Sequence, residues 1–308
     1  MNELPIIFIH SGNKKFLKYA LNQAKYFNKK TNIILIGDSP KDVNQNYCHF
    51  YSIENHKSSL HLLKNLYFHF STNSYDFEFD CIARWFILFD FMKQNKINWA
   101  CYLDSDFMLY SSVQDYFNKF ILNKHYEAAF CIPLQDHNQF RWTASGHVSF
   151  VSLEFLEKFC DYILRIYQTN KNIFQSKIKH HNENNLPGGI CDMTLLYLYY
   201  RAYSENIFNL LTISDDKVFD HNINMSSNYL PFEFIKKGQY KKIFYKQNKP
   251  YGLTVNRVRI NFLGIHFQGD SKKHMIYNYY NKMTLFNYLI SCLILTIKHK
   301  FLRVFKYL

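Results

Sequence analysis

The sequence predicts an α/β fold in which a mixed, mainly parallel β-sheet is flanked by helices. Two observations support this prediction: short apolar runs alternate with longer segments of helical periodicity, and the connections between them are short. A strand, a helix and a second strand joined in this way favour parallel pairing, because the helix carries the chain back to the starting edge of the sheet. We expect one α/β domain over residues 1–280 and a C-terminal helical tail over residues 281–308.

The N-terminal part of the chain contains the first unit of this kind. Residues 6–9 form an apolar, β-rich run, residues 14–30 repeat apolar side chains at helical spacing, and residues 33–36 form a second buried-type strand. Gly12 follows the first strand closely, at the edge where open α/β sheets bind ligands. We therefore expect Gly12 to line a ligand site.

The remaining elements follow from the same patterns. Residues 170–189 are polar and end in Pro187-Gly188-Gly189, which predicts a loop that can close over a ligand. Residues 212–262 are irregular, with short strand-like pieces. Apolar periodicity predicts helices over 75–96, 153–167 and 191–203, and strands over 99–103, 127–133, 148–151 and 258–265.

The composition is that of a globular protein, with 48% hydrophobic and 20% charged residues in 308. The 37 Lys and Arg residues outnumber the 24 Asp and Glu residues, and the net charge of +13 favours anionic partners such as nucleic acid, an anionic membrane or phosphorylated substrates. A basic nucleic-acid-binding protein is one alternative, because 19% aromatic residues would suit base stacking. No nucleic-acid-binding motif occurs, however, and the aromatic residues lie mainly in core-like runs.

The cysteines and the termini predict a cytoplasmic protein. None of the seven cysteines forms a CxxC pair, which argues against a zinc ribbon or a thioredoxin motif, and their odd number and wide spacing fit a reducing compartment. The N-terminus has no basic region before its apolar run, and no stretch reaches 18 consecutive apolar residues.

The strongest chemical signal is Asp104-Ser105-Asp106, directly after the buried run 99–103. Two carboxylates one residue apart at a strand end can hold a hard divalent cation through oxygen. Mn²⁺ or Mg²⁺ keeps open positions that nucleotide phosphates can fill. A solvated turn is the alternative, and the preceding apolar strand favours the metal site.

A second signal is His266-Phe267-Gln268-Gly269-Asp270-Ser271-Lys272, at the end of another predicted strand. A neutral imidazole at His266 can complete a metal site. Gly269 lets the backbone approach an anion closely, and Lys272 can place a point charge on a phosphate.

Together these two motifs resemble those of GT-A fold nucleotide-sugar glycosyltransferases, and in particular the retaining family of glycogenin and bacterial lipopolysaccharide galactosyltransferases. The resemblance implies a GT-A-like fold and a hexosyltransferase that uses a UDP-sugar donor. It implies that Asp104, Asp106 and His266 ligate the metal and that Lys272 contacts the donor diphosphate. Arg84 matches an upstream arginine of the family, which implies contact with the donor sugar or orientation of the acidic motif.

The chain matches other family segments only in part. Ser145-Gly146 resembles the Asn-Ser-Gly turn, but Ala144 replaces the asparagine. Asp192 matches one position of the Asp-Gln-Asp segment, and Met193 and Thr194 replace the other two. These departures leave retention or inversion open, with retention the outcome of the family itself.

Two acidic positions outside the main motifs allow either a functional or a purely structural interpretation. Asp192 opens a predicted helix, where it can accept hydrogen bonds from sugar hydroxyls, take the acceptor proton or simply cap the helix. Asp136-His137 either lines the acceptor side or lies at the surface.

The sequence thus predicts a metal-dependent glycosyltransferase that extends a growing surface glycan, such as lipooligosaccharide or capsule, as the family analogy implies. A non-catalytic homologue that only binds the donor is the other alternative. Retention of both acids, the histidine and the lysine argues against it.

The C-terminal tail combines an apolar stretch over 285–297 with interleaved basic residues over 298–308. The apolar stretch is too short to span a bilayer of about 30 Å as a helix. Basic and apolar residues at this spacing suit a helix in an anionic membrane interface, so we expect peripheral contact at the inner face of the cytoplasmic membrane. A helix that docks on the core or on another subunit is the alternative.

Overall fold

The computed structural model describes residues 3–12, 15–40, 43, 46–133, 140, 142–169 and 172–279. Its central feature is a seven-stranded sheet with the strand order β3-β2-β1-β4-β7-β6-β8. β7 runs antiparallel to its neighbours β4 and β6, and the other neighbouring pairs are parallel. The strands are β1 (Ile6–His10), β2 (Ile33–Gly37), β3 (Cys48–Ser52), β4 (Trp99–Leu103), β6 (Ala128–Cys131), β7 (Ser145–Ser152) and β8 (Ile207–Asn209).

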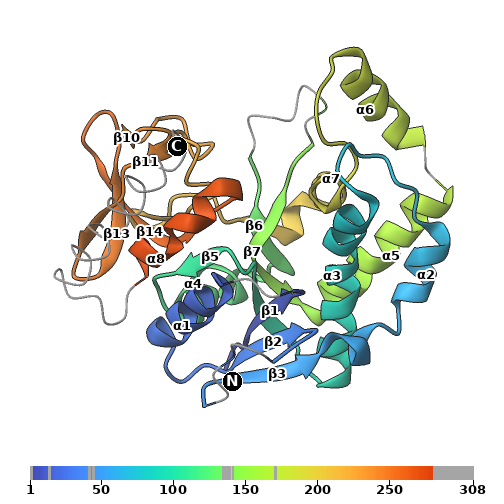
Figure 1. The fold of residues 1–308 in the computed structure, drawn as a ribbon, viewed down its shortest axis with the longest axis horizontal. Coiled ribbons are helices and arrows are strands. Elements are labelled where there is room, and N and C mark those ends of the chain that lie inside the picture. The colour runs from blue at the N-terminus through green and yellow to red at the C-terminus, as the bar shows by residue number, and fades with distance from the viewer. Residues whose placement is uncertain are drawn as a thin grey trace, which may run out of the picture.

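Helices cover both faces of this sheet, as Figure 1 shows. Side chains such as Ile7 and Tyr102 pack in one core cluster with residues of α2, α3, α5 and α7. Their sequence neighbours Phe8 and Leu103 pack in a second cluster with residues of α1 and α4. Strands buried on both faces read as continuous apolar runs, which is why the sequence shows no alternation there.

The four predicted helices, α1, α3, α5 and α7, begin and end within three residues of where the periodicity places them. α3 starts after Ser74, whose hydroxyl accepts a hydrogen bond from the N–H of Phe77 at 3.4 Å. The helices are α1 (Leu17–Phe27), α2 (Leu60–Leu66), α3 (Tyr75–Gln94), α4 (Val113–Phe120), α5 (Leu153–Thr169), α6 (Asn172–Glu183), α7 (Asp192–Ala202) and α8 (Met275–Asn278), with 3-10 turns η1 (Ile53–His56), η2 (Leu122–Lys124), η4 (Ser204–Asn206) and η5 (Gly269–His274).

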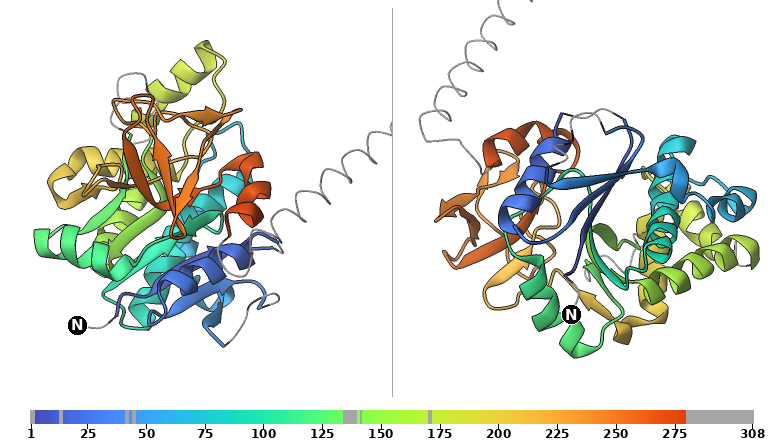
Figure 2. Two further views of the ribbon diagram at one scale, coloured as in Figure 1. Left: turned by 90° about the vertical axis from the view of Figure 1, so that its left-hand side faces the viewer. Right: turned by 90° about the horizontal axis from the view of Figure 1, so that it is seen from below.

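A smaller sheet lies beside the large one. In the left view of Figure 2 its orange strands stand above the blue and green strands of the large sheet. It has the order β12-β13-β14-β5, and β9 pairs with β14. Its strands are β5 (Phe107–Leu109), β9 (Lys217–Phe219), β12 (Phe244–Lys246), β13 (Lys249–Leu253) and β14 (Arg259–His266), with a separate hairpin of β10 (Lys236–Lys237) and β11 (Tyr240–Lys241).

The topology confirms the predicted α/β class, a mixed and mainly parallel sheet flanked by helices. The expectation of a loop over 170–189 is wrong, because α6 occupies Asn172–Glu183. This helix buries Phe174 and Lys177, which stand one helical turn apart, and the high polarity of the segment hid that spacing.

Two of the predicted features lie outside the described residues: the pair Asp136-His137 and the tail over 281–308. Among the residues that are described, no helix combines the length and the apolar character needed to cross a membrane.

Candidate active site

The acid pair lies where the two sheets meet. β4 ends at Leu103 and β5 begins at Phe107, so Asp104 and Asp106 stand on the turn between them. The backbone fixes this turn, since the Asp104 N–H donates to the carbonyl of His147 at 2.8 Å and the Phe107 N–H donates to the carbonyl of Asp104 at 3.0 Å.

Strand pairing explains how a histidine from the end of the chain reaches these acids. β14 pairs antiparallel with β5, and His266 stands opposite Phe107 in the register. The next residue, Phe267, donates its N–H to the carbonyl of Asp106 at 3.0 Å. His266 is therefore held beside Asp106 by the ladder itself.

One ligand atom from each of Asp104, Asp106 and His266 lies within 4.8 Å of the others. His266 Nε2 is 3.4 Å from Asp106 Oδ1, and Lys272 Nζ is 3.0 Å from Asp106 Oδ2. Two carboxylates and an imidazole are a donor set that suits Mn²⁺ and also accommodates Mg²⁺. The structure thus brings together the residues predicted to bind a metal and a phosphate.

The charges in this group shift two pKa values in opposite directions. Burial opposes ionisation of Asp106, but the charges of His266 and Lys272 outweigh it and lower the pKa of this carboxyl. Burial also opposes protonation of His266, but the Asp106 carboxylate outweighs it and raises the pKa of the imidazole. Asp106 is therefore a carboxylate at neutral pH, which is the form that binds a cation.

Hydrogen bonds orient the His266 ring. Its Nδ1 lies 2.7 Å from the carbonyl of His221, which leaves Nε2 directed at Asp106. The ring also stacks on His147, with centroids 4.1 Å apart and an angle of 8° between the planes.

A buried ion pair supports the strand that carries this histidine. The Lys241 ammonium lies 2.6 Å from Asp220 Oδ1, and both side chains are fully shielded from solvent. The other oxygen of Asp220 accepts the backbone N–H of His266 at 3.3 Å. No local pattern connects these three residues: the pairing of β9 with β14 brings Asp220 to His266, and Lys241 comes from β11.

Arg84 joins the acid pair to the second predicted catalytic position. This side chain of α3 donates to Asp104 Oδ1 at 2.6 Å and also forms an ion pair with Asp192. The Tyr102 hydroxyl donates to the same Asp104 oxygen at 2.7 Å. Trp85 Nε1 donates to Asp192 Oδ2 at 3.3 Å.

The sequence could have pointed to two of these partners. Tyr102 precedes Asp104 by two residues, and alternate residues of an extended chain face the same way. Trp85 is adjacent to Arg84. The possibility that Asp192 only caps its helix is wrong, because Cys191 is the N-cap residue and the Asp192 carboxylate turns to Arg84 and Trp85.

The two predicted glycines adopt left-handed backbone conformations that favour glycine, with φ +81° at Gly12 and +62° at Gly269. Gly269 begins the 3-10 turn that carries Lys272. The Gly12 N–H donates to Asp38 Oδ2 at 2.8 Å, so this glycine is bonded to the end of β2. A contact of 5.3 Å between Lys272 Nζ and the ring of Phe16 connects the turn after β1 with the group around Asp106.

The loop that contains Gly188 and Gly189 is attached to the chain before α3. The Thr72 N–H donates to the carbonyl of Gly188 at 3.1 Å, and the Ile190 N–H donates to the carbonyl of Phe70 at 2.8 Å. A Cβ at Gly189 would lie 1.9 Å from the Phe70 carbonyl oxygen. Gly189 is therefore required because the backbone of this loop lies directly against the backbone at Phe70. Within the described part of the chain, the structure shows this attachment and no closure of the loop over a ligand.

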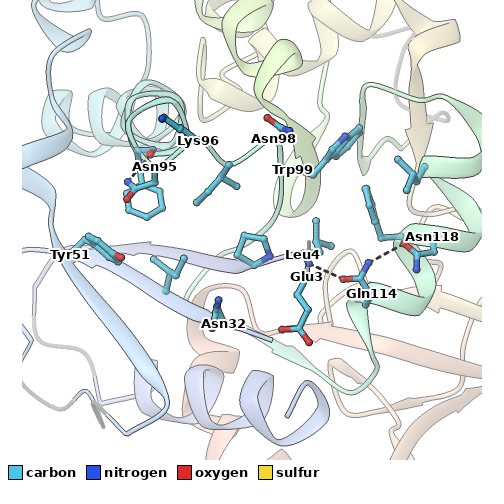
Figure 3. A pocket seen from close by; sticks show the side chains of 16 residues that line it. Glu3, Leu4, Asn32, Tyr51, Asn95, Lys96, Asn98, Trp99, Gln114 and Asn118 are labelled. Atoms are coloured by element: carbon cyan, nitrogen blue, oxygen red, sulfur yellow. Dashed lines mark hydrogen bonds between the residues drawn. The ribbon is translucent and has the colours of Figure 1, made fainter. Parts of the chain in front are cut away.

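A cavity of about 740 Å³ opens at the opposite, amino-terminal edge of the parallel strands (Figure 3). Its lining includes Asn32, Asn98 and Trp99, which stand just before β2 or at the start of β4. The acids follow the other end of β4, so this cavity is separate from the candidate active site.

Several solved structures are similar over part of the chain. Mouse xyloside xylosyltransferase 1, in its apo form, aligns at 12% identity with a TM-score of 0.44, covering 68% of this chain and 85% of that chain. The galactosyltransferase LgtC, in complex with donor and acceptor sugar analogues, aligns at 10% identity with a TM-score of 0.36, covering 67% and 73%. A cytidylyltransferase from Leptospira borgpetersenii aligns at 14% identity with a TM-score of 0.34, covering 59% and 73%.

No protein-family model matches the chain, and no curated protein matches it either. Because the structural similarities are partial and the identities low, the chemistry of the site has to identify the function.

Proposed function

We propose that this protein is a metal-dependent glycosyltransferase whose catalytic domain spans residues 1–280. It transfers a sugar from a nucleotide-sugar donor, a UDP-sugar, to a hydroxyl group of a growing surface glycan such as lipooligosaccharide or capsule. One observation supports this proposal above the others: Asp104, Asp106, His266 and Lys272 come from two distant parts of the chain and lie together in one contiguous group.

The donor set fits a divalent cation held by Asp104, Asp106 and His266, and Mn²⁺ or Mg²⁺ bound there would neutralise charge on the donor diphosphate. Lys272 would add a positive charge beside the leaving phosphate, where negative charge grows as the sugar–phosphate bond breaks. Lys272 is about one-third exposed, so it can reach a ligand from its place beside Asp106.

Arg84 acts as a positioning residue in this proposal, because its guanidinium holds the carboxylates of Asp104 and Asp192 in fixed places. Arg84 and Trp85 both donate to Oδ2 of the Asp192 carboxylate. Its Oδ1 is the atom that we propose accepts a hydrogen bond from a sugar hydroxyl of the donor. The acceptor hydroxyl then attacks the anomeric carbon and loses its proton to a base, while the bond between the sugar and the donor phosphate breaks. The proposal allows either retention or inversion at this carbon.

The metal assignment is tested by Asp106→Asn. This substitution removes one ligand charge with little change in volume, so we expect manganese-dependent hydrolysis or transfer of UDP-sugars to fall at least about 100-fold while the variant still folds, as circular dichroism would show. Asp161→Asn, at an exposed position of α5, is the matched control and should keep wild-type activity. Full activity of Asp106→Asn in the presence of a chelator would show that the metal assignment is wrong.

The phosphate assignment is tested by Lys272→Ala. Loss of a hydrogen bond from a charged donor, about 1.5–3 kcal/mol, should weaken manganese-dependent UDP binding about 10- to 100-fold by titration calorimetry. Lys273→Ala changes the same charge at the exposed neighbouring position and should leave the Kd unchanged. Equal affinity of Lys272→Ala and wild type would remove Lys272 from the site.

A screen of UDP-sugars for thermal stabilisation with manganese present identifies the donor. Stabilisation without hydrolysis or transfer to any acceptor would favour the non-catalytic homologue. Salt-dependent binding of oligonucleotides with no response to UDP-sugars would favour the nucleic-acid-binding alternative.

We propose further that the basic and apolar tail holds the enzyme at the inner face of the cytoplasmic membrane. The support is its sequence, because each basic residue near an anionic surface contributes about 1 kcal/mol. Replacing Lys298, Lys300, Arg303 and Lys306 by glutamine in the full chain should release the protein from anionic vesicles and spare UDP binding. A wild-type chain that ignores anionic vesicles at low salt would contradict the proposal.

A further inference from the structure

A second cluster of metal-binding side chains lies next to the candidate active site. It consists of Cys131 at the end of β6, His147 in β7 and His221 in the segment after β9. One ligand atom from each lies within 4.8 Å of the others. Cys131 and His147 are buried and His221 is partly exposed. The proposed glycosyl transfer uses none of the three.

The distance between two of the ligand atoms fits tetrahedral zinc. Cys131 Sγ lies 3.6 Å from His147 Nε2. With a zinc–sulfur bond of about 2.3 Å and a zinc–nitrogen bond of about 2.0 Å, a tetrahedral angle separates the two ligand atoms by about 3.5 Å. An ion can therefore bridge these atoms with little movement of either strand.

The backbone and one neighbour fix this geometry. The pairing of β6 with β7 shifts register between Phe130 and Cys131, so that Cys131 pairs with Ser145. Such irregularities re-aim side chains next to functional sites. The Ser145 hydroxyl lies 2.8 Å from His147 Nδ1, the ring atom opposite to the one that faces Cys131. A metal-binding histidine donates its second ring N–H to an oxygen atom, and the Ser145 hydroxyl can accept it.

Nε2 of His147 also lies 3.1 Å from the carbonyl of Asp220, to which it can donate a proton. Metal binding needs this nitrogen without its proton, and the proton can move to Nδ1 because the Ser145 hydroxyl can accept as well as donate. The imidazole stays neutral in this exchange.

His221 shows a polar atom without a partner. Its Nδ1 is buried and has no hydrogen bond within the described part of the chain. A buried polar atom in this state destabilises the fold, and a bound ion is one explanation for it.

A thiolate and two neutral imidazoles are the forms of these side chains that bind zinc.

We propose that Cys131, His147 and His221 bind one Zn²⁺. A sulfur and two imidazole nitrogens form a soft donor set that favours zinc over Mn²⁺ and Mg²⁺, so this site and the carboxylate site select different metals. Binding releases the thiol proton to solvent, and water completes the coordination from the partly exposed side of His221.

The zinc site would position the third ligand of the neighbouring metal site. His147 stacks on the ring of His266, and the His221 carbonyl is hydrogen-bonded to the Nδ1 of the same ring. An ion that fixes both His147 and His221 fixes the two surfaces that orient His266. The zinc ion would therefore act through His266, without touching the donor.

Metal analysis of the full chain tests the proposal. The protein is purified under reducing conditions and dialysed free of loosely bound ions, and zinc is measured by mass spectrometry. We expect about one zinc ion per chain. Cys131→Ala and His221→Ala should each lower the zinc content at least about tenfold, as loss of a ligand does. Cys160→Ala, which removes a buried thiol on α5, is the control and should keep the zinc.

Cobalt gives an independent readout, because a Co²⁺–thiolate bond absorbs in the near ultraviolet. Wild type and Cys160→Ala should show this band on cobalt titration, and Cys131→Ala should not. If Cys131→Ala fails to fold, His221→Ala decides, since His221 is partly exposed. Equal zinc in wild type and the folded variant, or no thiolate band at saturating cobalt, would overturn the proposal. Neither measurement uses a UDP-sugar or manganese, so its result is independent of the proposed transferase activity.

Discussion

Replacing Arg84 by methionine tests how the acid pair is held in place. The Arg84 side chain is only 16% exposed and carries ion pairs to Asp104 and Asp192, whose side chains are 23% and 4% exposed. Removing the cation leaves two carboxylates close together without their counter-charge. Breaking a buried ion pair costs about 3–5 kcal/mol, so we expect this loss in the free energy of unfolding. With a urea m-value of about 3 kcal/mol/M, the midpoint should fall by about 1–2 M.

A double-mutant cycle with Asp192→Asn separates the charge effect from packing. The double variant Arg84→Met/Asp192→Asn has no unpaired charge at position 192, so its destabilisation should be about 2 kcal/mol smaller than the sum of the two single effects. Urea unfolding followed by circular dichroism measures all four proteins. Arg165→Met, at an exposed position of α5, should change the stability by no more than about 0.5 kcal/mol. Additive effects within about 0.5 kcal/mol would refute the reasoning that these side chains act as one network.

Three further predictions concern the surroundings of the site. Burial lowers the pKa of Lys177 to about 8 from 10.5, so the unfolded chain binds the extra proton between these values and stability should rise with pH there. The difference in unfolding free energy between wild type and Lys177→Met should shift by about 3 kcal/mol across pH 8 to 10.5, and a flat difference would contradict the burial of a neutral amine. Gly189→Ala should lower the urea midpoint more than Gly188→Ala, because only at position 189 does a Cβ meet a backbone oxygen, at 1.9 Å; equal loss would point to backbone strain alone. Gly146→Ala should cost about 1–3 kcal/mol in the same assay, since its Cβ would lie 2.4 Å from the Trp85 ring, and wild-type stability would show that the ring moves freely.

Local sequence patterns were sufficient to predict the elements that carry the acid pair. The apolar run over 99–103 coincides with β4, and the acids follow it at the strand end. The histidine motif at 266 was predicted as the end of a strand and is the last residue of β14. In these cases a strand end and a functional side chain are neighbours in the sequence, so periodicity and motif point to the same place.

The rest of the site depends on contacts that the sequence does not encode locally. His147 lies beside Cys131 because the register between β6 and β7 is irregular. Lys241 in β11 pairs with Asp220, which follows β9, and the periodicity of the sequence resolved neither of these short strands. α6 was missed for a different reason: Lys177 is a charged residue that counts as surface in any pattern, yet it is buried and donates to Thr194 at 2.9 Å.

The pairing of β5 with β14 has a consequence for synthesis of the chain. Asp104 and Asp106 leave the ribosome early, with β4 and the N-terminal strands, but His266 and Lys272 belong to the last described segment. A nascent chain can therefore fold much of the large sheet while its acids still lack their histidine and their counter-charge. Asp104, Asp106, His266 and Lys272 come together only after β14 has closed a long loop onto β5, which is a slow, non-local step. Until then the growing protein carries an acidic turn whose two carboxylates lack the imidazole and the ammonium group that surround Asp106 in the folded chain.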